Sequence, residues 1–389
     1  MKTFYTIILT ACFFTACNKQ PISPTNNFAT GIPWKDSSAQ HPLNVQLTAL
    51  LEKYVKKGLP GISLLVTDKN GTWVGCAGKA DIENNKPFTI NQVSKIASIH
   101  KMFLGTLLFK LFEDSVNSGV GYAALQKKID TWLPHNITGR LANGNIVTLG
   151  QLMKHESGIP DFIEEDNFYL TVLNTPLKQW KQEDLISFVY DKPALFKPGD
   201  TAIYSNTNII LISMIIDKIT GRSHADVLRE KILNPLQLTH TFYAPYDPLP
   251  NTVAQGYFDL YNNDQLVNVS NLLSGGMYSN IFDLQKFLNA LLIDKTILSE
   301  KSLSIMQTFG KPDAPNRYGY GIMQKFIERG ENAGIGHSGR DLGYSANLFY
   351  YPNKNVIHAF VMNYGTDGNS DLKQVFIDFE NELMDLTLQ

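Results

Sequence analysis

The sequence has few cysteines and no excess of positive charge, and both shortages exclude whole classes of protein. Among its 389 residues, the three cysteines (Cys12, Cys17 and Cys76) form no C-x-x-C pair, and the eight histidines form no H-E-x-x-H. These spacings argue against a zinc site. The 34 Lys and Arg residues and 36 Asp and Glu residues give a net charge of −2, without the basic stripe typical of nucleic-acid-binding proteins. We therefore expect no metal, no other cofactor and no nucleic acid as a partner.

Apolar runs long enough to cross a membrane are also missing, but a shorter apolar run lies at the N-terminus. Residues 4–16 (FYTIILTACFFTA) follow Lys2. As a helix they would span about 20 Å, whereas the hydrocarbon core of a bilayer is about 30 Å thick. A positive charge followed by a short apolar run is typical of a cleaved export signal rather than of a membrane span.

The end of this run resembles a bacterial lipobox, in which a lipidated cysteine becomes the mature N-terminus. Thr15-Ala16-Cys17 fits the motif, although Phe14 stands where Leu is preferred, and Cys12 is an alternative site. Residues 18–42 are rich in Pro, Asn, Ser and Thr, which suits a tether. We expect residues 1–17 to be a lipoprotein-type signal peptide with Cys17 lipidated. The chain would then be exported to the bacterial cell envelope and anchored to a membrane facing the periplasm, with plain secretion as the alternative.

The remainder of the chain has an ordinary globular composition, with 43% hydrophobic and 18% charged residues. Apolar residues recur at helical spacing in 45–57, and two strand patterns follow at 61–67 and 72–80. Further strand patterns lie near the C-terminus, at 318–325, 344–351 and 355–363, before a last helix at about 370–386.

These patterns predict an α/β fold of the α+β type in a single domain, 43–389. Strands from about 43–95 and 306–389 can form one antiparallel sheet flanked by helices. A mostly helical lobe, about 96–305, is inserted between them.

A candidate nucleophile lies at the start of a helix of this lobe that is apolar almost all round. Ser98 and Lys101 form an S-x-x-K motif in its first turn, and Ser370 and Lys373 form a second one. Capping alone explains Ser370, which opens an amphipathic helix. Lys101 is expected to be partly desolvated by its buried helix, which lowers the pKa of an amine and lets it take the serine proton.

Two further elements could complete such a site. Tyr204-Ser205-Asn206 follows a Lys-Pro-Gly turn and precedes an apolar helix, but Tyr278-Ser279-Asn280 is an identical tripeptide, and the residues alone do not decide between them. A tyrosine beside a lysine can relay a proton, and an asparagine can bridge lysine and substrate. His337-Ser338-Gly339, the only H-x-G in the chain, suits a substrate carboxylate or carbonyl.

In this order, the three elements resemble the β-lactamase-related serine hydrolases, which include class C β-lactamases, DD-peptidases and family esterases. Other stretches agree: LMKHESGIPDF (152–162), FKPGDTAIYSN (196–206), SGGMYSN (274–280), YGYGI (318–322) and GHSGRDLGYSANLFYYPN (336–353). In that family the tyrosine motif follows the Lys-Pro-Gly turn, which favours Tyr204. The resemblance implies catalytic roles for Ser98, Lys101, Tyr204 and Asn206, and substrate binding by His337, Ser338, Gly339 and Arg340.

The third element departs from class C β-lactamases, which carry Lys-Thr-Gly there. Histidine is mostly neutral at pH 7 and holds a carboxylate less firmly, although Arg340 could restore positive charge. By resemblance, the backbone N–H groups of Ser98 and Arg340 form the oxyanion hole. We expect an acyl-enzyme hydrolase that resembles a D-amino-acid peptidase or DD-carboxypeptidase and acts on cell-wall-type peptides. Its partner would be a small molecule or peptide with a D-Ala-like, ester or amide carbonyl. A β-lactamase, an esterase and a non-catalytic penicillin-binding sensor are the alternatives.

Overall fold

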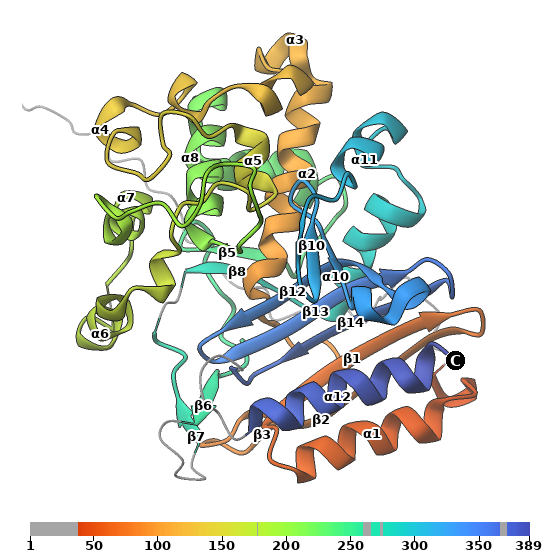
Figure 1. Cartoon of the computed structure of the whole chain (residues 1–389). Coiled ribbons are helices and arrows are strands. Elements are labelled where there is room, and N and C mark those ends of the chain that lie inside the picture. The colour runs from red at the N-terminus through yellow and green to blue at the C-terminus, as the bar shows by residue number, and fades with distance from the viewer. Residues whose placement is uncertain (1–37, 177, 260–265, 273–274, 366–371) are drawn as a thin grey trace, which may run out of the picture. The chain divides into compact units, whose positions relative to one another are not determined.

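The computed structural model describes residues 38–176, 178–259, 266–272, 275–365 and 372–389. Its largest element is a nine-stranded antiparallel sheet with strands from both ends of the chain, as predicted (Figure 1). From edge to edge the strands are β3 (Lys86–Pro87), β2 (Gly71–Asp81), β1 (Gly61–Asp68), β14 (Val356–Met362), β13 (Tyr344–Tyr351), β12 (Gly334–Asp341), β11 (Met323–Lys325), β10 (Asn316–Tyr318) and β9 (Pro312–Asp313). Two segments that are distant in sequence meet where β1 pairs with β14, in register from Ile62 opposite Met362.

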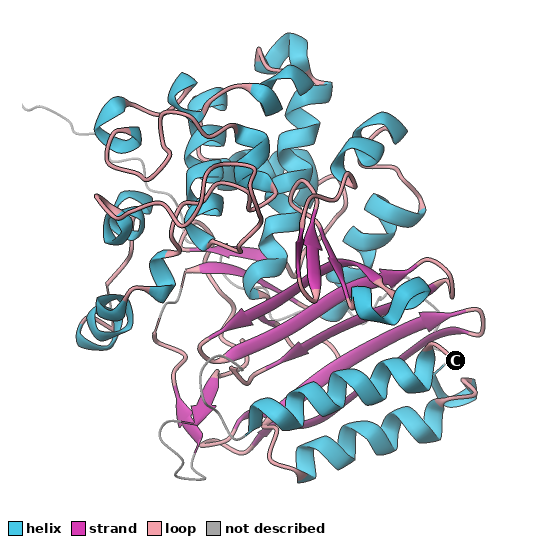
Figure 2. Ribbon diagram, viewed as in Figure 1, coloured by secondary structure: helices cyan, strands magenta, loops and turns pink. Residues whose placement is uncertain are grey.

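Two helices cover one face of the sheet, and the helical lobe lies on its other side (Figure 2). The covering helices are α1 (Asn44–Lys56) and α12 (Leu372–Thr387), which pack against each other. On the opposite face, α10 (Ile281–Leu288) contacts β13, β14 and β1. The lobe contains α2 (His100–Glu113), α3 (Ser115–Ser118), α4 (His135–Thr138), α5 (Leu149–Met153), α6 (Asp166–Asn174), α7 (Gln182–Ile186), α8 (Asn206–Thr220), α9 (His224–Leu228) and α11 (Glu300–Met306).

Small strands connect the lobe to the sheet. β8 (Gly276–Ser279) pairs with both β4 (Ser94–Lys95) and β5 (Phe242–Ala244), and β6 (Tyr257–Asp259) pairs with β7 (Leu266–Asn268). Among the residues described, no helix is both long and apolar enough to cross a bilayer.

The predicted elements are confirmed with two corrections. The single strand expected at 318–325 is two short strands, β10 and β11, separated by a turn in which Gly321 has a φ of +76°. The strand β12 was missed, because its sequence GIGHSGRD lacks the hydrophobic alternation that marks a strand. Consequently His337 and Gly339 lie within a strand and not in a loop before one.

The N-terminal predictions fall mostly outside the described residues, including Cys12, Cys17 and Ser370. Residues 38–42, assigned to the tether, contact the sheet instead. The hydroxyl of Ser38, in the short 3₁₀ turn Ser38–Gln40, accepts a hydrogen bond from the Val74 N–H, and His41 contacts Asp68 at 3.1 Å.

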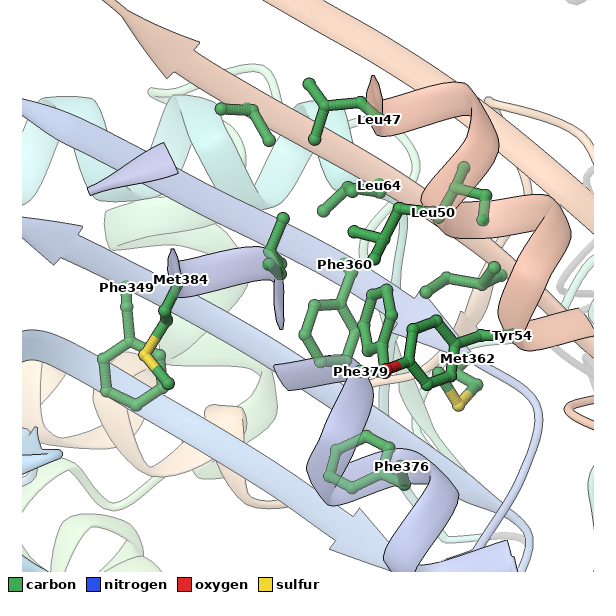
Figure 3. Packing of buried hydrophobic residues seen from close by; sticks show 14 of the residues in the cluster. Leu47, Leu50, Tyr54, Leu64, Phe349, Phe360, Met362, Phe376, Phe379 and Met384 are labelled. Carbon is green, nitrogen blue, oxygen red and sulfur yellow. The ribbon is translucent and has the colours of Figure 1, made fainter. Parts of the chain in front are cut away.

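An apolar core fills the space between the sheet and the α1–α12 layer (Figure 3). Phe379 of α12 is fully buried, and its ring packs edge-on against Tyr54 of α1 and Phe360 of β14, each with ring centroids 5.4 Å apart. The α1 residues predicted to share a buried face do so: Leu47, Leu50, Leu51 and Tyr54.

Phe379→Ala should therefore lower the free energy of unfolding by about 3–5 kcal/mol, because it removes transfer energy and leaves a cavity. Ile377→Ala, on the 38% exposed side of the same helix, is the matched control and should cost under about 1 kcal/mol. Urea unfolding of the two variants measures both values. Equal losses would contradict this placement of the core.

Candidate active site

Ser98 lies at the junction of the two lobes, in a short 3₁₀ turn (Ala97–Ile99) that leads directly into α2. Strand β12 crosses this turn so closely that a Cβ on Gly339 would overlap the carbonyl oxygen of Ile96. Ala97 adopts a left-handed φ of +44°, which is strained for a residue with a side chain. The fold thus holds Ser98 in a fixed position against the edge of the H-x-G element.

Three predicted catalytic side chains converge on Ser98. Lys101 Nζ lies 3.0 Å from Ser98 Oγ, and the Tyr204 hydroxyl donates to the same oxygen at 2.7 Å. Lys101 also donates to Asn206 Oδ1 at 2.8 Å. The arrangement links a nucleophile to a base on one side and to a phenol on the other, as serine acyl transfer requires.

Burial sets the protonation of Lys101, which is only 2% exposed. Desolvation lowers its pKa to about 7, and the carboxylates of Asp161 and Asp341 raise it in part. Near pH 7 about half of the amine is therefore neutral and can accept the Ser98 proton.

The structure decides between the two identical tripeptides. Tyr204 reaches Ser98, whereas Tyr278 lies in β8, where its strand pairs with Lys95 and its ring packs edge-on against Tyr344. His155 fixes the first tripeptide, because its ring stacks on Tyr204 at 4.4 Å and its Nδ1 accepts the N–H of Ser205 at 3.1 Å. These contacts make His155 a structural residue of the loop.

The side chains of the H-x-G element alternate between the two faces of β12. His337 faces Lys101 and is 2% exposed, and burial lowers the pKa of its ring to about 3, with the charge of Lys101 acting in the same direction. It lines a small cavity of about 10 Å³, the size of one water molecule, together with Lys101, His155 and Tyr318. The imidazole is therefore neutral and lies beside the lysine.

The side chains of Ser338 and Arg340 point to the opposite face of β12 from His337. The hydroxyl of Ser338 faces the α12 side and contacts the sulfur of Met323 at 3.8 Å. The Arg340 guanidinium also faces that side and pairs with Glu380 of α12 at 3.1 Å. The Arg340 guanidinium thus pairs with Glu380 instead of lying free beside His337, and its part in substrate binding stays a prediction. A role for its backbone N–H in an oxyanion hole stays a prediction.

A cavity of about 590 Å³ opens from Ser98 into the helical lobe. Lys101 and Asn206 line its reactive end, together with the paired side chains of Lys95 and Asp341. Aromatic side chains form much of the remaining wall: Phe162, Phe168, Tyr169, Trp180, Tyr243 and Tyr246. A cavity with this lining and volume is large enough for a bulky apolar group.

Sequence reasoning missed one polar residue of the site, Asp161. It is 7% exposed, and its Oδ2 accepts a hydrogen bond from Asn206 Nδ2 at 2.8 Å. Burial raises the pKa of this carboxyl to about 6. Only its position in the stretch 152–162, which matches the family, could have drawn attention to it.

If Lys101 is the base, acylation of Ser98 should follow the deprotonation of this amine. The neutral fraction rises from about 10% at pH 6 to about 90% at pH 8 for a pKa of about 7, so the rate should rise roughly ninefold. Intact-mass spectrometry with a fluorescent penicillin measures the rate at each pH. Lys101→Arg, which keeps the charge but cannot deprotonate, should lose about 10²–10⁴-fold, and an unchanged profile would exclude Lys101 as the base.

Comparisons with known proteins agree with this geometry. Residues 47–377 match the protein family described as Beta-lactamase. Protein flp of Staphylococcus aureus (strain MRSA252) is 25% identical over 322 residues, which cover 80% of this chain and 61% of that protein. Penicillin-binding protein 4* of Bacillus subtilis (strain 168) is 27% identical over 297 residues, or 70% of this chain and again 61% of that protein. The chain therefore matches less than two thirds of the length of either relative.

Two solved structures are similar over nearly their whole length. A D-stereospecific amidohydrolase from Streptomyces sp. has a TM-score of 0.73 at 27% identity, covering 86% of this chain and 97% of that one. The D-amino acid amidase of Ochrobactrum anthropi SV3, in complex with L-phenylalanine amide, has a TM-score of 0.72 at 25% identity, covering 89% and 98%. The family match extends over most of the chain and includes all the converging side chains, so the chain belongs to the beta-lactamase family of serine hydrolases.

Proposed function

We propose that the chain is an exported, lipid-anchored hydrolase that acts through an acyl-enzyme on amides or short peptides of D-amino acids. The observation that carries the proposal is the contact of Ser98 with both Lys101 and Tyr204 at the reactive end of an aromatic-lined cavity. The similarity to the D-stereospecific amidohydrolase and the D-amino acid amidase supports the choice of substrate.

In the first half-reaction, neutral Lys101 takes the Ser98 proton while Oγ bonds to the substrate carbonyl carbon. Backbone N–H groups of Ser98 and Arg340 would stabilise the negative oxygen, a contribution worth about 3–4 kcal/mol per donor. The phenol of Tyr204 donates its proton to the leaving nitrogen as the C–N bond breaks, and it regains a proton from Lys101. In the second half-reaction, the same groups remove a proton from the water that attacks the acyl-enzyme ester. The bond from the acyl carbon to Ser98 Oγ then breaks, Oγ takes up that proton, and the carboxylic acid leaves.

The electrostatics of β12 favour an amide over a substrate that ends in a free carboxylate beside the scissile bond. His337 is neutral, and the Arg340 guanidinium pairs with Glu380 on the opposite face. A DD-carboxypeptidase or a β-lactamase would need positive charge at this end of the site. Both stay alternatives, as do an esterase and a non-catalytic penicillin-binding sensor.

Ser98→Ala should lower the hydrolysis of D-phenylalanine amide by about 10³-fold or more, because it removes the nucleophile. Ser370→Ala, in the other S-x-x-K motif, is the matched control and should leave the rate unchanged. Ammonia release measured for the D- and L-amides tests both the activity and its stereochemistry.

Three other outcomes would overturn the proposal. Full activity of Ser98→Ala would exclude this nucleophile. Turnover of nitrocefin that is faster than turnover of the amide would favour a β-lactamase. If the protein neither hydrolysed these probes nor formed a covalent adduct with any of them, the result would favour the non-catalytic sensor.

A further inference from the structure

The loop at 155–162 is fastened to the start of α8 by several buried hydrogen bonds. The Thr207 hydroxyl donates to the Pro160 carbonyl at 2.7 Å and accepts from the Phe162 N–H at 3.1 Å. The Ser157 hydroxyl donates to Asn208 Oδ1 at 2.8 Å. The loop therefore holds a constant position relative to the Tyr-Ser-Asn element.

Asp161 is the acidic residue that this loop places against the catalytic groups. Its Oδ1 accepts the N–H of Ile163 at 3.3 Å, which fixes the carboxylate at the start of a 3₁₀ turn (Phe162–Glu164). Its Oδ2 accepts Asn206 Nδ2 at 2.8 Å. Both oxygens of the carboxylate are thus engaged, and one of them is directed at the asparagine that contacts Lys101.

The carboxylate determines which way the Asn206 amide is turned. An ionised carboxylate only accepts hydrogen bonds, so the NH₂ end of the amide must face Asp161. The oxygen end then faces Lys101, at 2.8 Å from Nζ. A neutral amine that donates to this oxygen is left with its lone pair free to point at the Ser98 hydroxyl, which is the geometry that proton transfer needs.

We propose that Asp161 is a positioning residue that acts through Asn206 to orient the Lys101 amine toward Ser98. The proposal rests on the acyl-enzyme function proposed above. If the side-chain amide of Asn206 were flipped by 180°, it would present an N–H to Lys101. The lone pair of the Lys101 amine would then be drawn toward that N–H and away from Ser98.

The Asp161 charge has a second, separable effect on Lys101. Two carboxylates raise the lysine pKa, those of Asp161 and Asp341, while Lys95 offsets Asp341 by pairing with it. The other titratable side chains around the amine are the phenol of Tyr204 and three histidines whose pKa values are lowered by burial and by Lys101: His100, His155 and His337. Removing the Asp161 charge destabilises the ammonium, so the Lys101 pKa should fall.

Two substitutions separate the hydrogen bond from the charge. Asp161→Asn removes the charge but keeps an oxygen that can accept from Asn206, whereas Asp161→Ala removes both. Glu164→Gln is the matched control, because it removes one exposed negative charge from the same turn. We expect Asp161→Ala to slow acylation by the fluorescent penicillin about 10–100-fold and Asp161→Asn to keep most of the rate. In both Asp161 variants, the acylation rate should begin to rise at a lower pH than in the wild type, because the pKa of Lys101 falls.

A double-mutant cycle tests whether Asp161 acts through Asn206. In an Asn206→Ala background, Asp161→Ala should cause little further loss of plateau rate, because its partner is gone. The proposal would be overturned if the rate loss in the double variant equalled the product of the losses in Asp161→Ala and Asn206→Ala. It would also be overturned if Asp161→Ala acylated as fast as Glu164→Gln.

The lysine can also be observed without any substrate. NMR of protein labelled with ¹³C at lysine Cε, with the Lys101 signal assigned from Lys101→Met, gives its titration midpoint directly. We expect a lower midpoint in Asp161→Asn than in Glu164→Gln, and equal midpoints would contradict the charge effect. This readout separates failure of the inference from failure of the proposed function, because it stands even if no probe acylates Ser98.

Discussion

The chemistry of this protein depends on the burial of one amine. Lys101 lies one turn into α2, a helix that is apolar nearly all round and packs between the sheet and the helical lobe. The same packing that stabilises the fold removes water from Nζ, and desolvation makes the ammonium unfavourable. An amine that is partly neutral near pH 7 therefore follows from the position of the helix, which is what the proposed role of Lys101 as base requires.

The groups around this amine are consistent with that requirement. The rings of His100, His155 and His337 all have lowered pKa values, with burial as the first cause and the lysine charge next, so they contribute dipoles and not charge. Strongly ionised neighbours would either fix the proton on the amine or expel it. Asp161 contacts Lys101 through Asn206, and its charge raises the pKa of the amine against the effect of burial.

The sequence predicts the elements whose signals are local, because periodicity and turn residues act over a few positions. The apolar α2, the Ser98–Lys101 spacing and the hairpin of β1 and β2 all have such signals. β12 does not, since its glycines serve the close crossing over the Ile96 carbonyl and remove the hydrophobic alternation. The side-chain direction of Arg340 depends on the register of that strand and could not be predicted without it.

Contacts between segments distant in sequence were equally inaccessible. The choice between Tyr204 and Tyr278 required knowing which loop lies beside Ser98, and the residues alone left both open. The aromatic wall of the cavity is drawn from α6, β5 and other segments between 162 and 246, with no common spacing. Asp161 gains its significance only from the 2.8 Å contact to a residue 45 positions later.

The alternation along β12 also limits what the third element can supply to a substrate. Positions 337, 339 and 341 face the reactive side and are a neutral histidine, a glycine that permits close approach, and an aspartate paired with Lys95. The intervening Arg340 stabilises the α12 layer through Glu380. The positive charge of Arg340 is therefore paired on the α12 side of the strand. The amide substrate proposed above suits such an edge, because an uncharged amide requires hydrogen bonds from the strand and no counter-charge.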